Sequence, residues 1–260
     1  MNSDHRNTVD NDNQPVYLVT GGSGAIGKEI SAQAATAGVR VAVHGSTPES
    51  AEVTVADLQQ RHPAAELLAC SGNFLEAGAI ASLVDQAAAH WGRLDGVIHC
   101  AITGAPGVTG PFAASDPSAY GAHAARVLAS FQQLCFHALP HLSRSAGAII
   151  GFTSDAGRFA AARQSLIAGA NGGLISFVRS LAVEIAADGV RVNCISPGFV
   201  ENTPSFEKFG AGGRGDTARK RAGLGLPRTE DIAPLALFLC SPGAGKITGQ
   251  VISINGGVNA

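Results

Sequence analysis

This chain of 260 residues has little charge and no long hydrophobic run. Asp, Glu, Lys and Arg together make up 15% of the residues, and the formal net charge is −2. A chain so close to neutral has no broad basic surface to attract nucleic acid or an anionic membrane, so we expect neither as a partner. An uninterrupted run of the roughly 18 apolar residues that a transmembrane helix needs is also missing from the sequence.

Cysteine is scarce and scattered along the chain. The 5 cysteines form no CxxC pair and no Cys/His cluster, and their odd number argues against a disulfide framework. We therefore expect free thiols in a reducing compartment and no metal site. Residues 1–14 are polar and rich in Asn and Asp, without the apolar centre of a signal peptide. These features predict a disordered N-terminal lead-in and a soluble, cytoplasmic protein.

Glycine and alanine are abundant, and one glycine-rich stretch has an informative order. The apolar run Val16–Thr20 stops at Gly21-Gly22-Ser23-Gly24, and helix-forming residues follow from Lys28 onward. This is a strand, a tight turn and a helix whose first N–H groups attract a pyrophosphate, while glycines let the backbone approach it closely. An ordinary turn can have the same composition, but the position of this stretch between a strand and a helix favours a phosphate-binding turn. The residues expected to bind the pyrophosphate are Gly21, Ser23, Ala25, Ile26 and Gly27.

Strand and helix patterns then alternate about six times. Continuous apolar runs at 39–44 and 190–196 are typical of parallel strands that are buried on both faces. The pattern predicts an α/β fold, a single-domain Rossmann-type doubly wound parallel sheet of about seven strands flanked by helices, over residues 15–260. Ligands of such sheets bind at the carboxyl ends of the strands. Further strands are expected at 65–70, 94–101, 147–154 and 250–255, and helices at 48–62, 77–91, 117–144, 161–187 and 229–240.

The loop after the second strand bears on the choice of cofactor. In dinucleotide-binding folds, an acid about 20 residues beyond the glycine turn bonds the adenosine ribose and repels a 2′-phosphate. Here the sequence reads His44-Gly45-Ser46-Thr47, with two hydroxyls, a histidine able to carry charge and no acid. This favours NADP over NAD. We expect Ser46 and Thr47 near the ribose, and Asn73 and Phe74 beside the adenine.

Several segments, in the right order, resemble the short-chain dehydrogenase/reductase family over about residues 15–258. These are Thr20-Gly21-x-x-x-Ala25-x-Gly27, with alanine where the family usually has glycine, Asp95, the segment 191–203, and 247–250 with 255–257. The resemblance implies a homodimer or homotetramer formed through the long helices at 117–144 and 161–187. It also implies that a nicotinamide cofactor lies against Ala101, Pro197, Gly198, Val200 and Thr203.

The same resemblance implies an Asn-Ser-Tyr-Lys catalytic set, of which this chain keeps only the serine, Ser154. At the family's spacing the tyrosine position is Ile167, the lysine position is Asn171, and the asparagine position falls near Arg126 or Val127. Isoleucine cannot donate a proton to a substrate oxygen, and asparagine carries no charge to lower a neighbouring pKa. The family's standard mechanism of carbonyl reduction, with a tyrosine and a lysine, is therefore not available to this chain.

Three functions stay open. The first is an atypical nicotinamide-dependent oxidoreductase that reduces a conjugated C=C bond or carbonyl of a small apolar substrate, with Ser154 stabilising the oxygen and Asp155 as a candidate acid. The second is a non-redox isomerase, dehydratase or cyclase, for which His99, His123 and His137 are candidate acid–base groups and Tyr120 is a further candidate that could reach the cleft. The third is a cofactor-binding homologue without catalysis.

Two features bear on the substrate. Residues 201–225 are polar and rich in glycine, which predicts an irregular, mobile lid over the pocket. Arg126, Arg158 and Arg163 are candidate groups for an anionic substrate, although surface ion pairs would explain them equally well.

Overall fold

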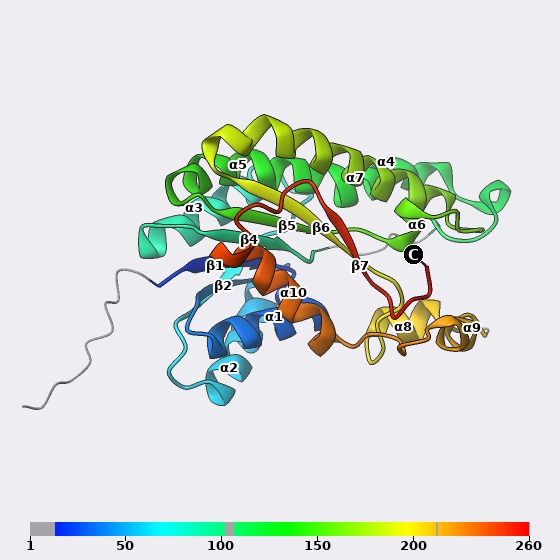
Figure 1. Ribbon diagram of the computed structural model, residues 1–260, viewed down its shortest axis with the longest axis horizontal. Helices are drawn as coiled ribbons and strands as arrows, with labels where there is room; N and C mark the ends of the chain where they lie inside the picture. The colour runs from blue at the N-terminus through cyan, green and yellow to red at the C-terminus, as the bar shows by residue number, and fades with distance from the viewer. Residues whose placement is uncertain (1–13, 102–106, 212, 260) are drawn as a thin grey trace, which may run out of the picture.

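A seven-stranded parallel sheet forms the centre of the molecule (Figure 1). The computed structural model describes residues 14–101, 107–211 and 213–259, so the lead-in expected at 1–14 lies almost wholly outside the described residues. The strand order is β3-β2-β1-β4-β5-β6-β7, and every neighbouring pair is parallel. This confirms the doubly wound sheet. The strands are β1 (Val16–Thr20), β2 (Arg40–Gly45), β3 (Leu67–Ser71), β4 (Gly96–His99), β5 (Ala148–Phe152), β6 (Arg191–Pro197) and β7 (Val251–Ile254).

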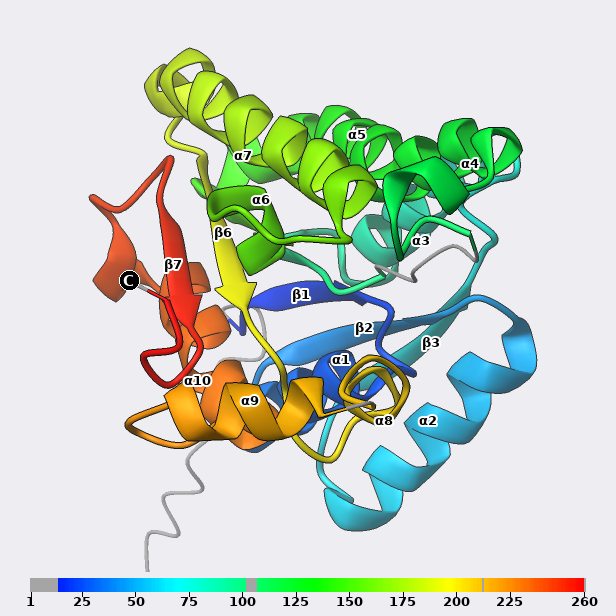
Figure 2. The same ribbon diagram turned by 90° about the vertical axis from the view of Figure 1, so that its right-hand side faces the viewer.

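Helices cover both faces of this sheet and make a three-layer molecule (Figures 1 and 2). On one face lie α3 (Ala79–Trp91), α5 (Ser130–Ser145) and α7 (Ser165–Ile185), and on the other lie α1 (Ala25–Thr36), α2 (Pro48–Arg61) and α10 (Thr229–Cys240). Each face has its own hydrophobic cluster, the first around Phe131 and Leu134, the second around Ile30 and Leu239. Because both faces are covered, β1, β2, β4 and β5 are buried along their whole length, which explains their continuous apolar runs.

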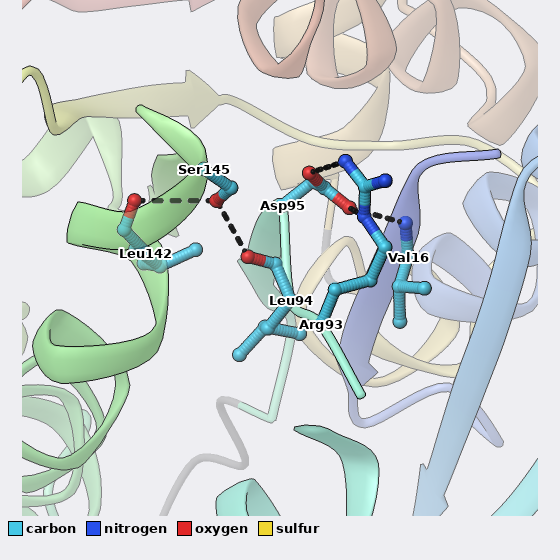
Figure 3. A network of polar contacts seen from close by, with 6 residues as sticks. All are labelled: Val16, Arg93, Leu94, Asp95, Leu142 and Ser145. Atoms are coloured by element: carbon cyan, nitrogen blue, oxygen red, sulfur yellow. Dashed lines mark hydrogen bonds and ion pairs between the residues drawn. The ribbon is translucent and has the colours of Figure 1, made fainter. Parts of the chain in front are cut away.

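Asp95 joins the start of β4 to its neighbours (Figure 3). Its carboxylate accepts a hydrogen bond from the backbone N–H of Val16 at 2.8 Å and pairs with the Arg93 guanidinium at 2.7 Å. The hydroxyl of Ser145, at the end of α5, donates to the carbonyl oxygen of Leu94 at 2.7 Å. These bonds hold the amino ends of β1 and β4 and the end of α5 together, and so fix the strands whose opposite ends carry the site.

The helix expected at 117–144 is broken into shorter pieces. A 3₁₀ turn (Pro117–Ala119) is followed by α4 (Tyr120–Ala124), a π-helical turn (Ala125–Ala129) and then α5. The helix expected from 161 begins only at Ser165, after a short α6 (Asp155–Arg158), because Arg163 has a left-handed backbone with φ 69° that a helix cannot contain. Further 3₁₀ turns lie at Phe112–Ala114, Ala186–Asp188 and Pro242–Ala244.

The expectation that residues 201–225 are irregular is wrong. The segment contains α8 (Pro204–Phe209) and α9 (Arg214–Arg221), which lie beyond the carboxyl end of β6 and near the C-terminus (Figure 1). Thr203 starts α8, since its hydroxyl accepts from the backbone N–H of Phe206 at 3.1 Å and Pro204 is pre-set for the first helical position. Gly210 directly follows α8, and Gly213 directly precedes α9.

One helical segment of the described residues, Ser165–Asp188, is long and apolar enough to cross a membrane by length and composition. Within its most apolar stretch of 18 residues, 33% is buried inside the protein. Leu174, Val178 and Leu181 belong to the hydrophobic cluster that packs on the sheet. The buried part of α7 therefore belongs to the core.

Candidate functional site

A cavity of about 1180 Å³ opens at the carboxyl edge of the sheet. It runs from the glycine turn before α1 to Ser154 after β5, and residues of α8 and α9 complete its wall. Two residues predicted for the site, Thr47 and Tyr120, are not among the described residues that line it. The predicted residues that do line it are Gly21, Ser23, Ala25, Ile26, Gly27, Ser46, Asn73, Phe74, Ala101, Ser154, Asp155, Pro197, Gly198, Val200 and Thr203.

The glycine turn is a narrow cradle in which side chains do not fit. Gly21 has φ +65°, and a Cβ there would lie 2.7 Å from the backbone nitrogen of Ala101. A Cβ on Gly27 would lie 2.8 Å from the carbonyl carbon of Gly21. The first helical hydrogen bond of α1 is Lys28 N–H to Gly24 O, so the N–H groups of the preceding helical residues have no intrahelical acceptor. No side chain caps α1 and no acid lies in its first turn, so the cradle fits an anionic pyrophosphate.

His44, at the end of β2, is a neutral structural group. Its Nδ1 accepts from the backbone N–H of Gly21 at 3.0 Å, and its Nε2 donates to the carbonyl oxygen of Gly72 at 2.9 Å. Burial lowers its pKa below the ordinary histidine value, more than the bond to Gly72 raises it. The hydrogen bonds of His44 therefore do not favour a charged imidazole facing a 2′-phosphate, which the sequence had left open. Of the two hydroxyls in this loop, that of Ser46 lines the cavity, whereas Thr47 caps α2 by accepting from the Ser50 N–H and is not among the described lining residues.

Phe74 belongs to a row of packed rings. It stacks on His44 with ring centroids 4.6 Å apart and on His99 at 5.9 Å. His99 is fully buried, its Nδ1 lies 2.8 Å from the hydroxyl of Thr20, and its Nε2 has no partner among the described residues. Asn73 is exposed, and its Oδ1 accepts from the Leu75 N–H. Phe74 thus lines the cavity while its ring is already packed against two imidazoles.

Ser154 and Asp155 have different tasks at the end of β5. The Ser154 oxygen accepts from the backbone N–H of Ala156 at 3.2 Å, which starts α6 and leaves the hydroxyl hydrogen free to donate into the cavity. The Asp155 carboxylate accepts from Ser196 at 2.8 Å and from Asn255 at 2.8 Å. Asp155 therefore joins the end of β5 to β6 and to the C-terminal segment, and holds these three segments in position.

The cavity wall beside Ser154 contains Ile167 and Asn171, both on α7. Asn171 is 3% exposed, donates to the carbonyl oxygen of Ile167 at 2.9 Å and accepts from the Thr153 hydroxyl at 3.3 Å. The Asn171 amide is therefore already hydrogen-bonded within the protein. Neither position supplies a titratable group to this end of the cavity, which we call the substrate end and define by Ser154, Ile167 and Asn171.

The other candidate acids and bases separate into two groups. The Tyr120 hydroxyl bonds Ser115 at 2.6 Å and its ring stacks on Phe112, outside the cavity lining. His137 and His99 are also absent from the described lining residues, and Arg158 bonds Ser253. His123 and Arg126, in contrast, both line the cavity.

Sequence reasoning expected residues 201–225 over the pocket but did not name the side chains that α8 and α9 supply to it. Phe206 and Phe209 line the cavity together with Arg214 and Arg221. Phe206 packs edge-on against Phe199 at 5.7 Å, and Arg214 lies over the Phe199 ring at 5.9 Å. The aromatic and basic side chains within a glycine-rich stretch were the signal that could have found them.

Comparisons with known proteins agree with this architecture. Residues 21–259 match the family profile described as Enoyl-(Acyl carrier protein) reductase. The chain is 30% identical to a cis-4-hydroxycyclohexanecarboxylate dehydrogenase of Sinomonas cyclohexanicum, covering 94% of this chain and 96% of the relative. It is 29% identical to the 7alpha-hydroxysteroid dehydrogenase of Escherichia coli K12, covering 92% of each chain.

Solved structures show the same fold. A short-chain type dehydrogenase/reductase from Mycobacterium ulcerans superposes with a TM-score of 0.88 at 27% identity, covering 94% of this chain and 89% of that one. A 7 alpha-hydroxysteroid dehydrogenase in complex with NADH and 7-oxo glycochenodeoxycholic acid superposes with a TM-score of 0.85 at 26% identity, covering 94% and 93%.

Proposed function

This chain belongs to the short-chain dehydrogenase/reductase family of oxidoreductases, and we propose that it reduces a conjugated C=C bond in a small, largely apolar substrate with a nicotinamide dinucleotide. The observation that carries the proposal is the substrate end of the cavity. A hydroxyl able to hold a substrate oxygen, Ser154, lies there, whereas Ile167 and Asn171 supply no proton donor. The description of the matching family profile, an enoyl reductase, supports this reaction.

The glycine cradle supports a bound dinucleotide, and the neighbouring loop supports NADP(H) over NAD(H). Ala25, Ile26 and Gly27 would hold the pyrophosphate through their free N–H groups, with Pro197, Gly198, Val200 and Thr203 against the nicotinamide. The loop after β2 presents the hydroxyl of Ser46 and no carboxylate that would repel a 2′-phosphate. When bound, the cofactor supplies the hydride.

Conjugated C=C reduction demands less of the protein than carbonyl reduction. Hydride addition at the β-carbon places negative charge on the carbonyl oxygen, where the Ser154 hydroxyl donates a hydrogen bond. The α-carbon then takes its proton from water, so no side chain at position 167 has to act as an acid. Ile167 contributes an apolar wall, and Phe152 and Phe159 extend it.

We also propose that α8 and α9 form a lid over the bound molecules. These helices supply Phe206, Phe209 and Arg214 to the cavity, and they are tied to the C-terminus by the bond from Arg221 to the carbonyl oxygen of Val258. A closed lid would exclude bulk water during hydride transfer and strengthen the bond from Ser154 to the developing charge, and water would reach the α-carbon when the lid opens.

Calorimetric titration of the purified protein with NADPH, NADH, NADP⁺ and NAD⁺ tests the cofactor assignment first. We expect tight binding with a preference for the phosphorylated pair. NADPH consumption is then compared for cyclohex-2-enone and its saturated counterpart, cyclohexanone. We expect turnover of the enone alone. Turnover of cyclohexanone would refute C=C specificity, and absence of binding by all four dinucleotides would refute the oxidoreductase in favour of a non-redox or non-catalytic homologue.

A further inference from the structure

Two nitrogen-bearing side chains from one helical stretch line the cavity and take no part in the function proposed above. His123 belongs to α4, and Arg126 belongs to the π-helical turn Ala125–Ala129 that follows it. That turn packs against α7, which carries Ile167. π-helical turns are rare and are found frequently at functional sites, because they redirect side chains that a regular helix would place elsewhere.

His123 is buried, with the backbone of Leu166 as a polar neighbour of its ring. It is 3% exposed, it lines the cavity, and neither of its ring nitrogens has a hydrogen-bond partner among the described residues. Burial lowers the pKa of His123 by more than the neighbouring backbone of Leu166 raises it. Leaving a buried polar group without a hydrogen bond is unfavourable, because the group has lost its bonds to water. A ligand atom in the cavity that accepts the imidazole N–H would remove that cost.

Arg126 is half-buried, and its guanidinium has no ion pair or hydrogen bond within the described part of the chain. Asp155 is the one acidic residue among the described residues of the cavity lining, and Ser196 and Asn255 already donate to its oxygens. The positive charge of Arg126 is thus not balanced by the cavity wall. A partly desolvated guanidinium of this kind favours a bound anion.

We propose that Arg126 and His123 bind a carboxylate group of the substrate. The planar guanidinium can donate two parallel bonds to the two carboxylate oxygens, and the neutral imidazole N–H can donate a third. The walls beside them, Val127 and Ile167, suit an apolar body. The inference rests on the proposed function and narrows its substrate class to small apolar carboxylic acids that also carry the conjugated C=C bond.

The binding of benzoate and benzamide tests the proposed carboxylate site without any turnover. They have nearly the same shape and differ in charge, and calorimetry gives their dissociation constants with the wild-type protein, with and without NADP⁺. We expect benzoate to bind at least about tenfold more tightly than benzamide, the value of one charge-assisted contact. R126M should make the two affinities equal, R126K should recover part of the preference, and H123L should weaken benzoate binding about fivefold.

R144M is the matched control, since Arg144 is exposed on α5 outside the cavity lining and its loss removes the same charge. It should leave the preference for benzoate unchanged. Equal affinities in the wild type, no benzoate binding at about 10 mM, or an unchanged preference in R126M would each overturn the carboxylate site. Thermal melting of R126M controls for folding. Because benzoate binding is measured without any reduction, it tests the carboxylate site even if the enone assay shows no activity.

Discussion

At the scale of single residues, Ser154 does two things with one oxygen. It accepts the Ala156 N–H that starts α6, and its own hydrogen is free to donate to a substrate. We expect S154A to lower kcat for enone reduction by about 100-fold, as removal of one oxyanion donor does elsewhere, and to leave cofactor affinity unchanged. S154T keeps the hydroxyl and should retain most of the activity. Steady-state kinetics with calorimetry separates the two effects, and an unaltered kcat in S154A would contradict the role.

His99 predicts a pH dependence of stability. Burial lowers its pKa from the ordinary 6.5 to about 3, with His44 as a smaller cause. Between these values the unfolded chain binds a proton that the folded chain does not, so stability falls as pH falls, by up to about 1.4 kcal/mol for each unit. We expect urea denaturation to show this loss below pH 6.5 and a shallower one in H99N, whose amide can still bond Thr20. Parallel curves for the two proteins would contradict the assignment.

At the scale of elements, the turn between β1 and α1 leaves no room at Gly27. A Cβ there would overlap the backbone of Gly21, whereas a Cβ on Gly24 would meet only the carbonyl oxygen of Gly21, at 3.2 Å. We expect G27A to lose at least about 2 kcal/mol of cofactor-binding free energy, roughly 30-fold, and G24A to lose much less. Calorimetry measures the affinities and thermal melting reports folding. Equal losses in the two variants would show that the close approach is unimportant.

The helices α8 and α9 predict a change in dynamics on binding. They complete the cavity wall and connect to the rest of the chain through few contacts, such as those of Arg221 with the C-terminal segment. Hydrogen–deuterium exchange in α8 and α9 should therefore slow when the dinucleotide binds, while exchange in α5 stays the same. Unchanged exchange in both helices under saturating cofactor would argue against a lid.

At the scale of the whole molecule, the helical layer of α5 and α7 carries large apolar side chains in solvent. Phe136 is 71% exposed and Val183 is 82% exposed. We expect a homodimer or homotetramer that covers this layer, and V183D should shift it toward the monomer in light scattering, because an unpaired carboxylate is costly in an apolar interface. L224D, at the equally exposed Leu224 in the 201–225 segment, is the control. A monomeric wild-type protein would contradict the assembly.

The sequence by itself determined the sheet and the glycine cradle. Parallel strands buried on both faces must be apolar throughout, so they could be predicted from local composition alone. Gly21 and Gly27 are required where backbones approach closely, and that requirement is also local. Ile167 and Asn171 could be read directly as residues without a proton to give.

The tertiary structure alone decided which polar groups are free. His44 could be a cation in the sequence, but its ring nitrogens meet Gly21 and Gly72 in space. Ser196 and Asn255, which lie far along the chain, donate hydrogen bonds to the Asp155 carboxylate. His123 lines the cavity, and its ring nitrogens make no hydrogen bond to the described residues. Hydrogen-bond partners and burial come from segments that only folding brings together. For this reason the sequence could only offer candidate groups, and the roles that we propose for Ser154, Arg126 and His123 depend on the tertiary structure.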